Sequence, residues 1–185
     1  MTDSSNLIHK YMVKGISITS LFRYLDEYYS EETSDTPRSK VKDHDKFPIM
    51  NSGWYPYELY IEILELIAAE CFNGQLSSLE ALGEYSSRNV LEGIYHAFVA
   101  RKDFIRFLTK ISVLHKRFYN SGDMEVRILS DNSAEILLKG APEYAEADIY
   151  IAGGFYATAA KVCGHPSAKY EFKRVVNGVR YLVSW

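Results

Sequence analysis

The sequence predicts an α+β fold, in which an N-terminal bundle of about four helices precedes a β-β-α-β-β unit that forms a four-stranded antiparallel sheet. Apolar residues recur at helical spacing up to about residue 118. After Gly122 the pattern changes to strict alternation, and a second alternating pair of segments meets at Asn177-Gly178, a strong hairpin signal. A length of 185 residues fits one domain, so we expect residues 1–185 to form a single ligand-binding domain.

The helical half is read from its apolar stripes and its end signals. Helices are expected over residues 17–31, 54–74, 77–98 and 103–118. The second has Pro56 in its first turn, and the third opens with the capping-box spacing Ser77–Glu80. Between the first two helices, residues 32–46 are polar and alternate in charge, which predicts an exposed loop.

The sheet half is read from alternation and turn residues. Strands are expected over residues 124–128, 134–138, 169–176 and 179–184, with a helix over residues 145–162 between the two hairpins. The adjacent Gly153 and Gly154 each cost a helix about 1 kcal/mol relative to alanine. We therefore expect another part of the chain to approach that helix closely.

Composition excludes several classes of protein. The formal net charge of −3 and the lack of a basic block argue against a nucleic-acid partner. No apolar run approaches the roughly 20 residues that cross a bilayer, so no membrane partner is expected. Cys71 and Cys163 do not form a disulfide framework, and the N-terminus does not resemble a secretion signal. These features predict a cytoplasmic protein.

Short segments spread from Met12 to Trp185 carry a family resemblance. They are Lys14-Gly15-Ile16, Trp54-Tyr55-Pro56, Glu58-Leu59-Tyr60, Leu82-Gly83-Glu84-Tyr85, Phe118-Tyr119 and Tyr181-Leu182-Val183-Ser184-Trp185. In this order they resemble the superfamily that unites heme-nitric oxide/oxygen-binding (H-NOX) domains with vinyl-reductase-type ligand-binding domains, whose fold TRAPP vesicle-tethering subunits share. The pattern is most similar to an uncharacterised bacterial family common in myxobacteria.

The resemblance implies a sensory or regulatory domain. Such domains enclose a heme, or an aromatic or hydrophobic small molecule, between helices and sheet, and signal to a protein partner. Aromatic residues make up 14% of this chain, and the second to fourth predicted helices carry more aromatic surface than a simple sheet cover requires. We therefore expect a small apolar or aromatic ligand, with a protein partner or a homodimer receiving the signal. The candidate ligand-binding residues are Tyr60, Leu64, Tyr95, Phe98, Leu108, Ile111 and His115.

An alternative is a heme-binding gas sensor in which His115 is the iron ligand. The stretch Phe107–His115 is similar to the helix that supplies the proximal heme histidine in H-NOX domains, and neutral imidazole suits that role. The tyrosine-serine-arginine motif that holds the heme propionates there is replaced by Leu138–Pro142. His115 also precedes Lys116 and Arg117, as an exposed histidine at a helix end would.

Other candidate sites are weaker. Cys163 and His165 supply two of the four ligands that structural zinc needs, so zinc is not expected. Glu143, Glu146 and Asp148 suit the positive end of a helix dipole. No nucleophile elbow, phosphate loop or dinucleotide motif is present, and we expect no enzyme. A further alternative is a ligand-free protein-interaction or dimerisation module with a filled interior.

Overall fold

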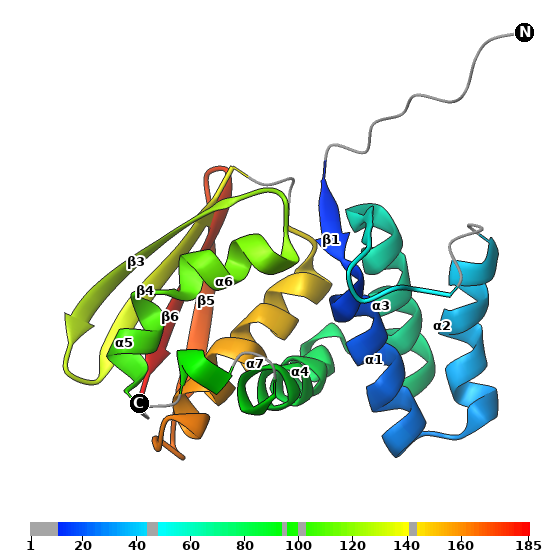
Figure 1. The fold of residues 1–185 in the computed structure, drawn as a ribbon, viewed down its shortest axis with the longest axis horizontal. Coiled ribbons are helices and arrows are strands. Elements are labelled where there is room, and N and C mark those ends of the chain that lie inside the picture. Colours follow the sequence, from blue (N-terminus) through cyan, green and yellow to red (C-terminus); the bar gives the residue numbers. More distant parts are fainter. Residues whose placement is uncertain (1–10, 44–47, 94–95, 100–102, 141–143) are drawn as a thin grey trace, which may run out of the picture.

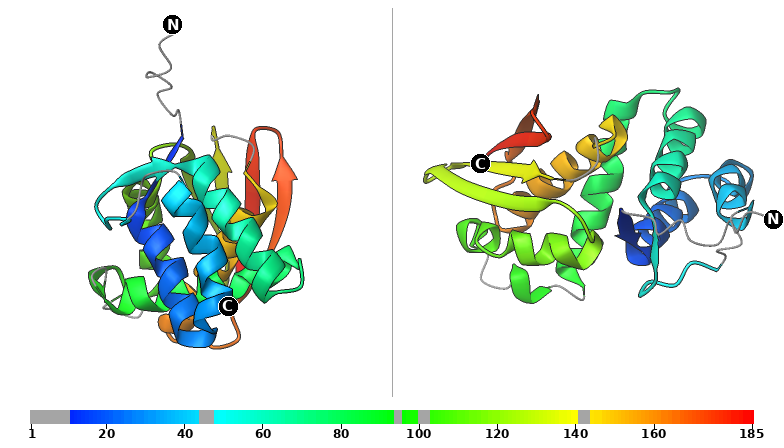
Figure 2. Two further views of the ribbon diagram at one scale, coloured as in Figure 1. Left: turned by 90° about the vertical axis from the view of Figure 1, so that its right-hand side faces the viewer. Right: turned by 90° about the horizontal axis from the view of Figure 1, so that it is seen from above.

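The computed structural model describes residues 11–43, 48–93, 96–99, 103–140 and 144–185 (Figure 1). Of Asp43 and Phe98 it describes the backbone alone. A four-stranded sheet lies at one end of the molecule and a group of helices at the other, with α4 (Glu80–Glu92) and α7 (Glu146–Val162) between them (Figures 1 and 2). The predicted α+β class and the four-stranded antiparallel sheet are confirmed.

The sheet consists of two hairpins placed side by side. Its strands are β3 (Asp123–Ser130), β4 (Ser133–Lys139), β5 (Lys169–Val175) and β6 (Gly178–Ser184), in the spatial order β3-β4-β6-β5. Asn177 has a φ of 57° in the β5–β6 turn, as its Asn-Gly sequence predicts. Alternate residues of β4 and β6, such as Ile136 and Tyr181, are buried, so one face of the sheet belongs to the core.

Helices α5 (Phe104–Leu108), α6 (Ile111–Phe118) and α7 supply the buried side chains that pack on this face. The predicted helix 145–162 agrees with α7, whereas the predicted helix 103–118 is divided in two. The backbone of Asp103 is extended, and its carboxylate accepts a hydrogen bond from the Arg106 amide at 2.9 Å, so it caps α5. At Lys110 the φ of −114° departs from helical geometry and separates α5 from α6.

The helical half contains more elements than predicted. It comprises β1 (Met12–Lys14), α1 (Gly15–Tyr28), α2 (Glu31–Asp43), β2 (Trp54–Pro56), α3 (Tyr57–Cys71), η1 (Leu76–Leu79), α4 and η2 (His96–Phe98). Residues 54–56 are therefore a strand paired with β1, and α3 begins only at Tyr57. The predicted helix 77–98 is divided because the backbone at Gly93, with ψ of −123°, leaves the helical region and ends α4.

The expectation of an exposed loop at residues 32–46 is wrong up to Asp43, because α2 covers residues 31–43; residues 44–46 lie outside the described residues. Acids in the first turn and lysines in the last turn favour this helix through its dipole. Val41 is completely buried, although it is the one large apolar residue of the helix. Burial by neighbouring elements therefore stabilises a helix that its own apolar pattern does not reveal.

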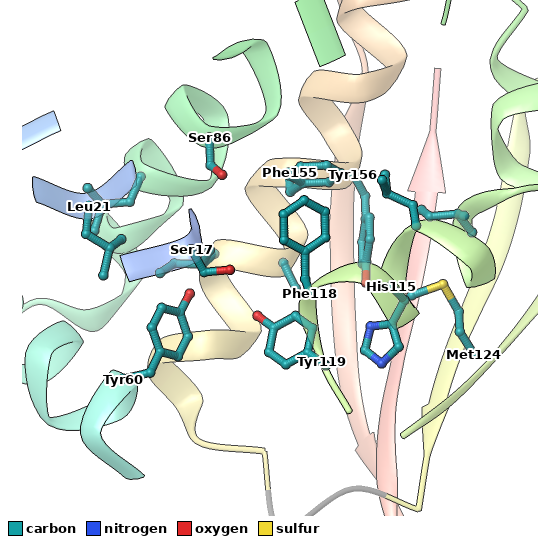
Figure 3. A pocket seen from close by; sticks show the side chains of 15 residues that line it. Ser17, Leu21, Tyr60, Ser86, His115, Phe118, Tyr119, Met124, Phe155 and Tyr156 are labelled. Atoms are coloured by element: carbon teal, nitrogen blue, oxygen red, sulfur yellow. The ribbon is translucent and has the colours of Figure 1, made fainter. Parts of the chain in front are cut away.

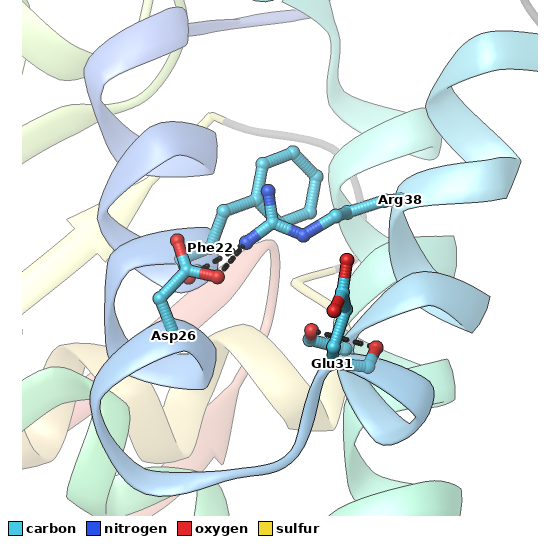
Figure 4. A network of polar contacts seen from close by, with 5 residues as sticks. Phe22, Asp26, Glu31 and Arg38 are labelled. Atoms are coloured by element: carbon cyan, nitrogen blue, oxygen red, sulfur yellow. Dashed lines mark hydrogen bonds and ion pairs between the residues drawn. The ribbon is translucent and has the colours of Figure 1, made fainter.

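Arg38 of α2 interacts with two residues of α1 and links the two helices (Figure 4). Its guanidinium lies 4.9 Å from the centre of the Phe22 ring and donates a hydrogen bond of 3.1 Å to the Phe22 carbonyl oxygen. It also pairs with the carboxylate of Asp26. One side chain thus combines a cation–π contact, a charged hydrogen bond and an ion pair across the two helices.

Two hydrophobic cores meet at α4 and α7. One lies between the sheet and helices α5 to α7, and the other is formed by α1 to α3 with the start of α4. Helices α4 and α7 approach closely because glycines lie at their contact. A Cβ atom on Gly83 would lie 2.1 Å from the Ile151 carbonyl oxygen, and one on Gly154 would lie 2.4 Å from that of Glu80. The close approach that the paired glycines predicted is confirmed.

Candidate functional site

A partly open cavity of about 80 Å³ lies where the two cores meet (Figure 3). Elements from both halves of the molecule contribute to its wall: α1, α3 and α4 from the helical half, and α6, β3 and α7 from the sheet half. The described residues of its lining are mostly apolar, and none of them is a lysine, arginine, aspartate or glutamate. The lining residues are Ser17, Leu21, Tyr60, Leu82, Ser86, Ile111, Leu114, His115, Phe118, Tyr119, Met124, Ile151, Ala152, Phe155 and Tyr156.

The volume limits what the cavity accepts without movement. An engineered cavity of about 150 Å³ in another protein admits benzene, so this one has roughly half that room. A single aromatic ring therefore fits once a lining side chain changes rotamer. Met124 is suited to this, because its unbranched side chain adapts easily and is only half-buried. The cavity matches a small ring better than a large planar cofactor.

His115 is buried at the cavity wall, and the alternative of an exposed histidine at a helix end is wrong. Its ring stacks on Tyr119 with centroids 5.0 Å apart, and Nε2 lies 3.0 Å from the Ser121 carbonyl oxygen. A carbonyl oxygen only accepts, so this contact assigns the proton to Nε2. Burial, with a smaller contribution from Lys116, lowers the pKa of His115 below 6.5 and favours the neutral ring.

Behind the cavity wall, one buried carboxyl group joins three elements. Tyr57 donates a hydrogen bond of 2.9 Å to Asp148 Oδ2, and Tyr119 donates one of 3.0 Å to Asp148 Oδ1. Burial raises the pKa of Asp148 to about 6, although the two hydrogen bonds act in the opposite direction. Burial and the nearby carboxylate also raise the pKa values of Tyr57, Tyr60 and Tyr119. The position of Asp148 near the start of a helix predicted only an interaction with the helix dipole, and no local pattern reveals this network.

The predicted ligand-binding residues divide into three groups. Tyr60, Ile111 and His115 line the cavity. Leu64 and Leu108 do not line it, because each is completely buried in one of the two cores. Tyr95 lies outside the described residues, as does the side chain of Phe98.

A heme does not fit the described residues as they are arranged. The cavity is small, and the rings of Phe118, Tyr119, Phe155 and Tyr156 occupy the space around it (Figure 3). The lining offers no cation to pair with heme propionates. The imidazole among these lining residues is that of His115, and its Nε2 is hydrogen-bonded to the Ser121 carbonyl oxygen. A heme would therefore require several aromatic rings and His115 to move.

Elsewhere in the described part of the chain, no group of three or more histidine, cysteine, aspartate or glutamate side chains is arranged to hold a metal ion. Cys163 is buried, and burial raises the pKa of its thiol to about 11. The His165 ring instead contacts Phe104 and Trp185. Among the described helices, none combines the length and the apolar character that a membrane span requires.

Comparison with known proteins connects the chain to one fold. No protein-family model and no curated protein matches the sequence. An H-NOX protein from K. algicida superposes with a TM-score of 0.69 at 15% identity, covering 92% of this chain and 95% of that one. An H-NOX protein from S. oneidensis in the Fe(II)NO state gives 0.69 at 14% identity, covering 92% and 98%.

An oxygen-binding H-NOX domain related to soluble guanylate cyclases gives a TM-score of 0.67 at 11% identity, covering 92% of this chain and 94% of that one. At these identities the likeness shows a shared fold. It extends over nearly the whole chain and includes both halves of the molecule that enclose the cavity.

Proposed function

We propose that this chain is a sensory or regulatory domain that binds a small, mostly apolar ligand in the cavity between its two cores. The observation that carries the proposal is an apolar cavity that is lined from both halves of the molecule and whose described lining residues include no lysine, arginine, aspartate or glutamate. A ligand there would touch α1, α3 and α4 on one side and α6 and α7 on the other. Its binding would change how the two halves pack, which is what a sensor requires.

Thermal unfolding in the presence of small aromatic compounds tests this proposal. A ligand that binds the folded state alone raises the melting temperature in proportion to the logarithm of its concentration over Kd. We expect such a rise with single-ring compounds such as toluene. The control is Ala152→Phe, which fills the cavity from α7 and should remove the rise. A panel that gives no rise with the natural chain would contradict the proposal.

A heme-binding gas sensor is the second candidate. It is favoured by a buried, neutral His115 at the cavity wall and by the shared fold with H-NOX proteins, which include an oxygen complex. The residues present would have to rearrange to admit the group, and for that reason this candidate ranks second. Heme added to the purified protein should give a Soret band that His115→Ala abolishes and His165→Ala preserves. No band, or an unchanged band in His115→Ala, would exclude His115 as the ligand.

We infer that the signal leaves through α1 to a protein partner or a second copy of the chain. Ser17 and Leu21 line the cavity, and Tyr24 and Tyr28 follow them along the same side of this helix. Tyr24 and Tyr28 contact Tyr85 of α4, with ring centroids 5.4 and 6.1 Å apart, and Tyr28 is exposed. A ligand-induced shift of α1 against α4 would therefore change an aromatic cluster at the surface.

We also propose a cytoplasmic location. We propose a role without catalysis, because the described residues of the cavity wall include no acid–base pair or activated nucleophile. The ligand-free interaction module remains the contrasting hypothesis. A chain that forms a stable dimer and shows no ligand-induced change in melting temperature would support that module instead.

A further inference from the structure

The cavity wall is divided into a hydroxyl-bearing side and an aromatic side. Figure 3 shows Ser17, Tyr60 and Ser86 on the side of the helical half. Phe118, Phe155 and Tyr156 lie on the opposite side. A purely apolar ligand would make favourable contacts with the aromatic side alone. The hydroxyl groups on the other side would lose their water without gaining a hydrogen-bond partner.

The hydroxyl groups of Ser17 and Ser86 make no hydrogen bond to any other described residue. The two serines come from different helices, α1 and α4, yet both oxygens face the same space (Figure 3). In α1 the neighbouring hydroxyl of Thr19, by contrast, donates to the Ile16 carbonyl oxygen at 3.2 Å. Both serines are half-buried, so water satisfies their hydroxyl groups in the empty cavity, and a ligand that displaces this water has to supply an acceptor in its place.

The charge around the cavity restricts the ligand further. Among the described residues of the wall there is no lysine or arginine, so an anionic group would enter beside them without a counterion. The Asp148 carboxyl group lies behind Tyr119, whose hydroxyl group donates its proton to Asp148 Oδ1 in a hydrogen bond of 3.0 Å. Tyr119 therefore has no proton left to donate to a ligand, whereas the serines remain free to donate.

On the basis of the proposed function, we infer that the ligand is an uncharged aromatic compound whose carbonyl-type oxygen accepts hydrogen bonds from Ser17 and Ser86. Its ring would lie among Phe118, Phe155 and Tyr156, where face and edge contacts between rings are favourable. Both ends of such a molecule match the part of the wall that they would touch. The two serines would determine specificity, because they distinguish an oxygen-bearing ring from its hydrocarbon counterpart.

Acetophenone and α-methylstyrene form a matched pair of probes, because they share a shape and differ by an oxygen in place of a methylene group. Titration calorimetry on the full chain gives Kd for both. The variant Ser17→Ala/Ser86→Ala should weaken acetophenone about tenfold and leave α-methylstyrene unchanged, as expected for two neutral hydrogen bonds. Comparing each probe across variants removes the difference in hydrophobicity between the two compounds.

The matched control is Ser20→Ala/Ser87→Ala, on the same two helices. Ser20 and Ser87 are buried and lie outside the cavity lining, so Kd for both probes should stay unchanged. Benzoate should bind at least tenfold more weakly than acetophenone, because its charge enters an uncharged wall. Equal effects of Ser17→Ala/Ser86→Ala on the two probes would overturn the carbonyl inference and leave the proposed function intact. Failure of both probes to bind would contradict the proposed function, and with it this inference.

Discussion

Replacing Asp148 by asparagine changes how stability depends on pH, and the direction follows from its environment. Asp148 is 2% exposed and accepts hydrogen bonds from two tyrosines. Burial raises the pKa of its carboxyl group from 3.8 to about 6, so the folded chain holds a proton more tightly than the unfolded chain. The stability that this group contributes is therefore fully present below pH 3.8 and is lost as the pH rises through about 6.

The expected magnitude comes from the pKa difference. At about 1.4 kcal/mol for each pKa unit, the shift corresponds to about 3 kcal/mol over the whole pH range. About 2 kcal/mol of this falls between about pH 4.5 and about pH 8. His115 acts in the opposite direction, because burial lowers its pKa and its contribution is lost as the pH falls. The difference between Asp148→Asn and the natural chain cancels the His115 contribution, which both share.

Urea unfolding of both proteins across this pH range provides the measurement. The free energy of unfolding of Asp148→Asn, relative to that of the natural chain, should increase by about 2 kcal/mol between about pH 4.5 and about pH 8, so the variant becomes relatively more stable as the pH rises. Asp131→Asn, at the exposed turn between β3 and β4, is the control for removing one acid. A relative stability of Asp148→Asn that stays constant with pH, or moves in the opposite direction, would refute the reasoning about burial.

Three further predictions concern packing and polar contacts. Gly83→Ala places a methyl group 2.1 Å from the Ile151 carbonyl oxygen, so α4 and α7 must separate. Thermal unfolding should show that the folded state loses more than about 2 kcal/mol of stability. An unchanged melting temperature would contradict the close contact. Arg38→Met removes the cation–π contact and the charged hydrogen bond to α1. The free energy of unfolding in urea should fall by about 1 to 2 kcal/mol, and amide exchange in α2 should become faster. Unchanged exchange in α2 would refute the role of the arginine. Tyr119→Phe removes a hydrogen bond that lowers the pKa of Asp148. Carbon NMR of the Asp148 carboxyl group should therefore show a pKa above about 6. A lower pKa in the variant would contradict this role of the hydrogen bond.

The parts of the fold that were predicted from the sequence are those with a clear local signal. Alternation and the Asn177-Gly178 turn located both hairpins, and the apolar stripe located α7. The expectation of a close contact at Gly153 and Gly154 was also correct, because two adjacent glycines weaken a helix unless packing requires them. In each case the residues that determine the element lie within the element itself.

The parts that were missed depend on residues far apart in the sequence. α2 has one large buried apolar residue, Val41, and its docking depends on Arg38 reaching Phe22 of another helix. The pairing of β1 with β2 joins three-residue segments about 40 positions apart, which no local pattern reveals. A short strand of this kind reads as a loop or as the start of the next helix.

The candidate site shows the same division. The apolar and aromatic stripe of the helical half pointed to Ile111, and the resemblance of Phe107–His115 to the heme-ligating helix of H-NOX domains pointed to His115; both residues line the cavity. Leu64 and Leu108 belong to the same kind of apolar stripe, but their side chains are buried in the cores. An apolar stripe predicts which residues are buried and does not predict which of them line a cavity. The partners of Asp148 are 91 and 29 positions away in the chain, so its burial could not be read from its position in the first turn of a helix.

The central claim is that the space between the two cores receives a small aromatic ring. Crystals of the chain soaked in bromobenzene test this directly, because the bromine atom gives an anomalous signal at its own position. We expect a bromine peak within the wall formed by Ile111, Phe118 and Phe155, with Met124 in a changed rotamer. A map with no peak there, and with lining side chains filling the space, would contradict it.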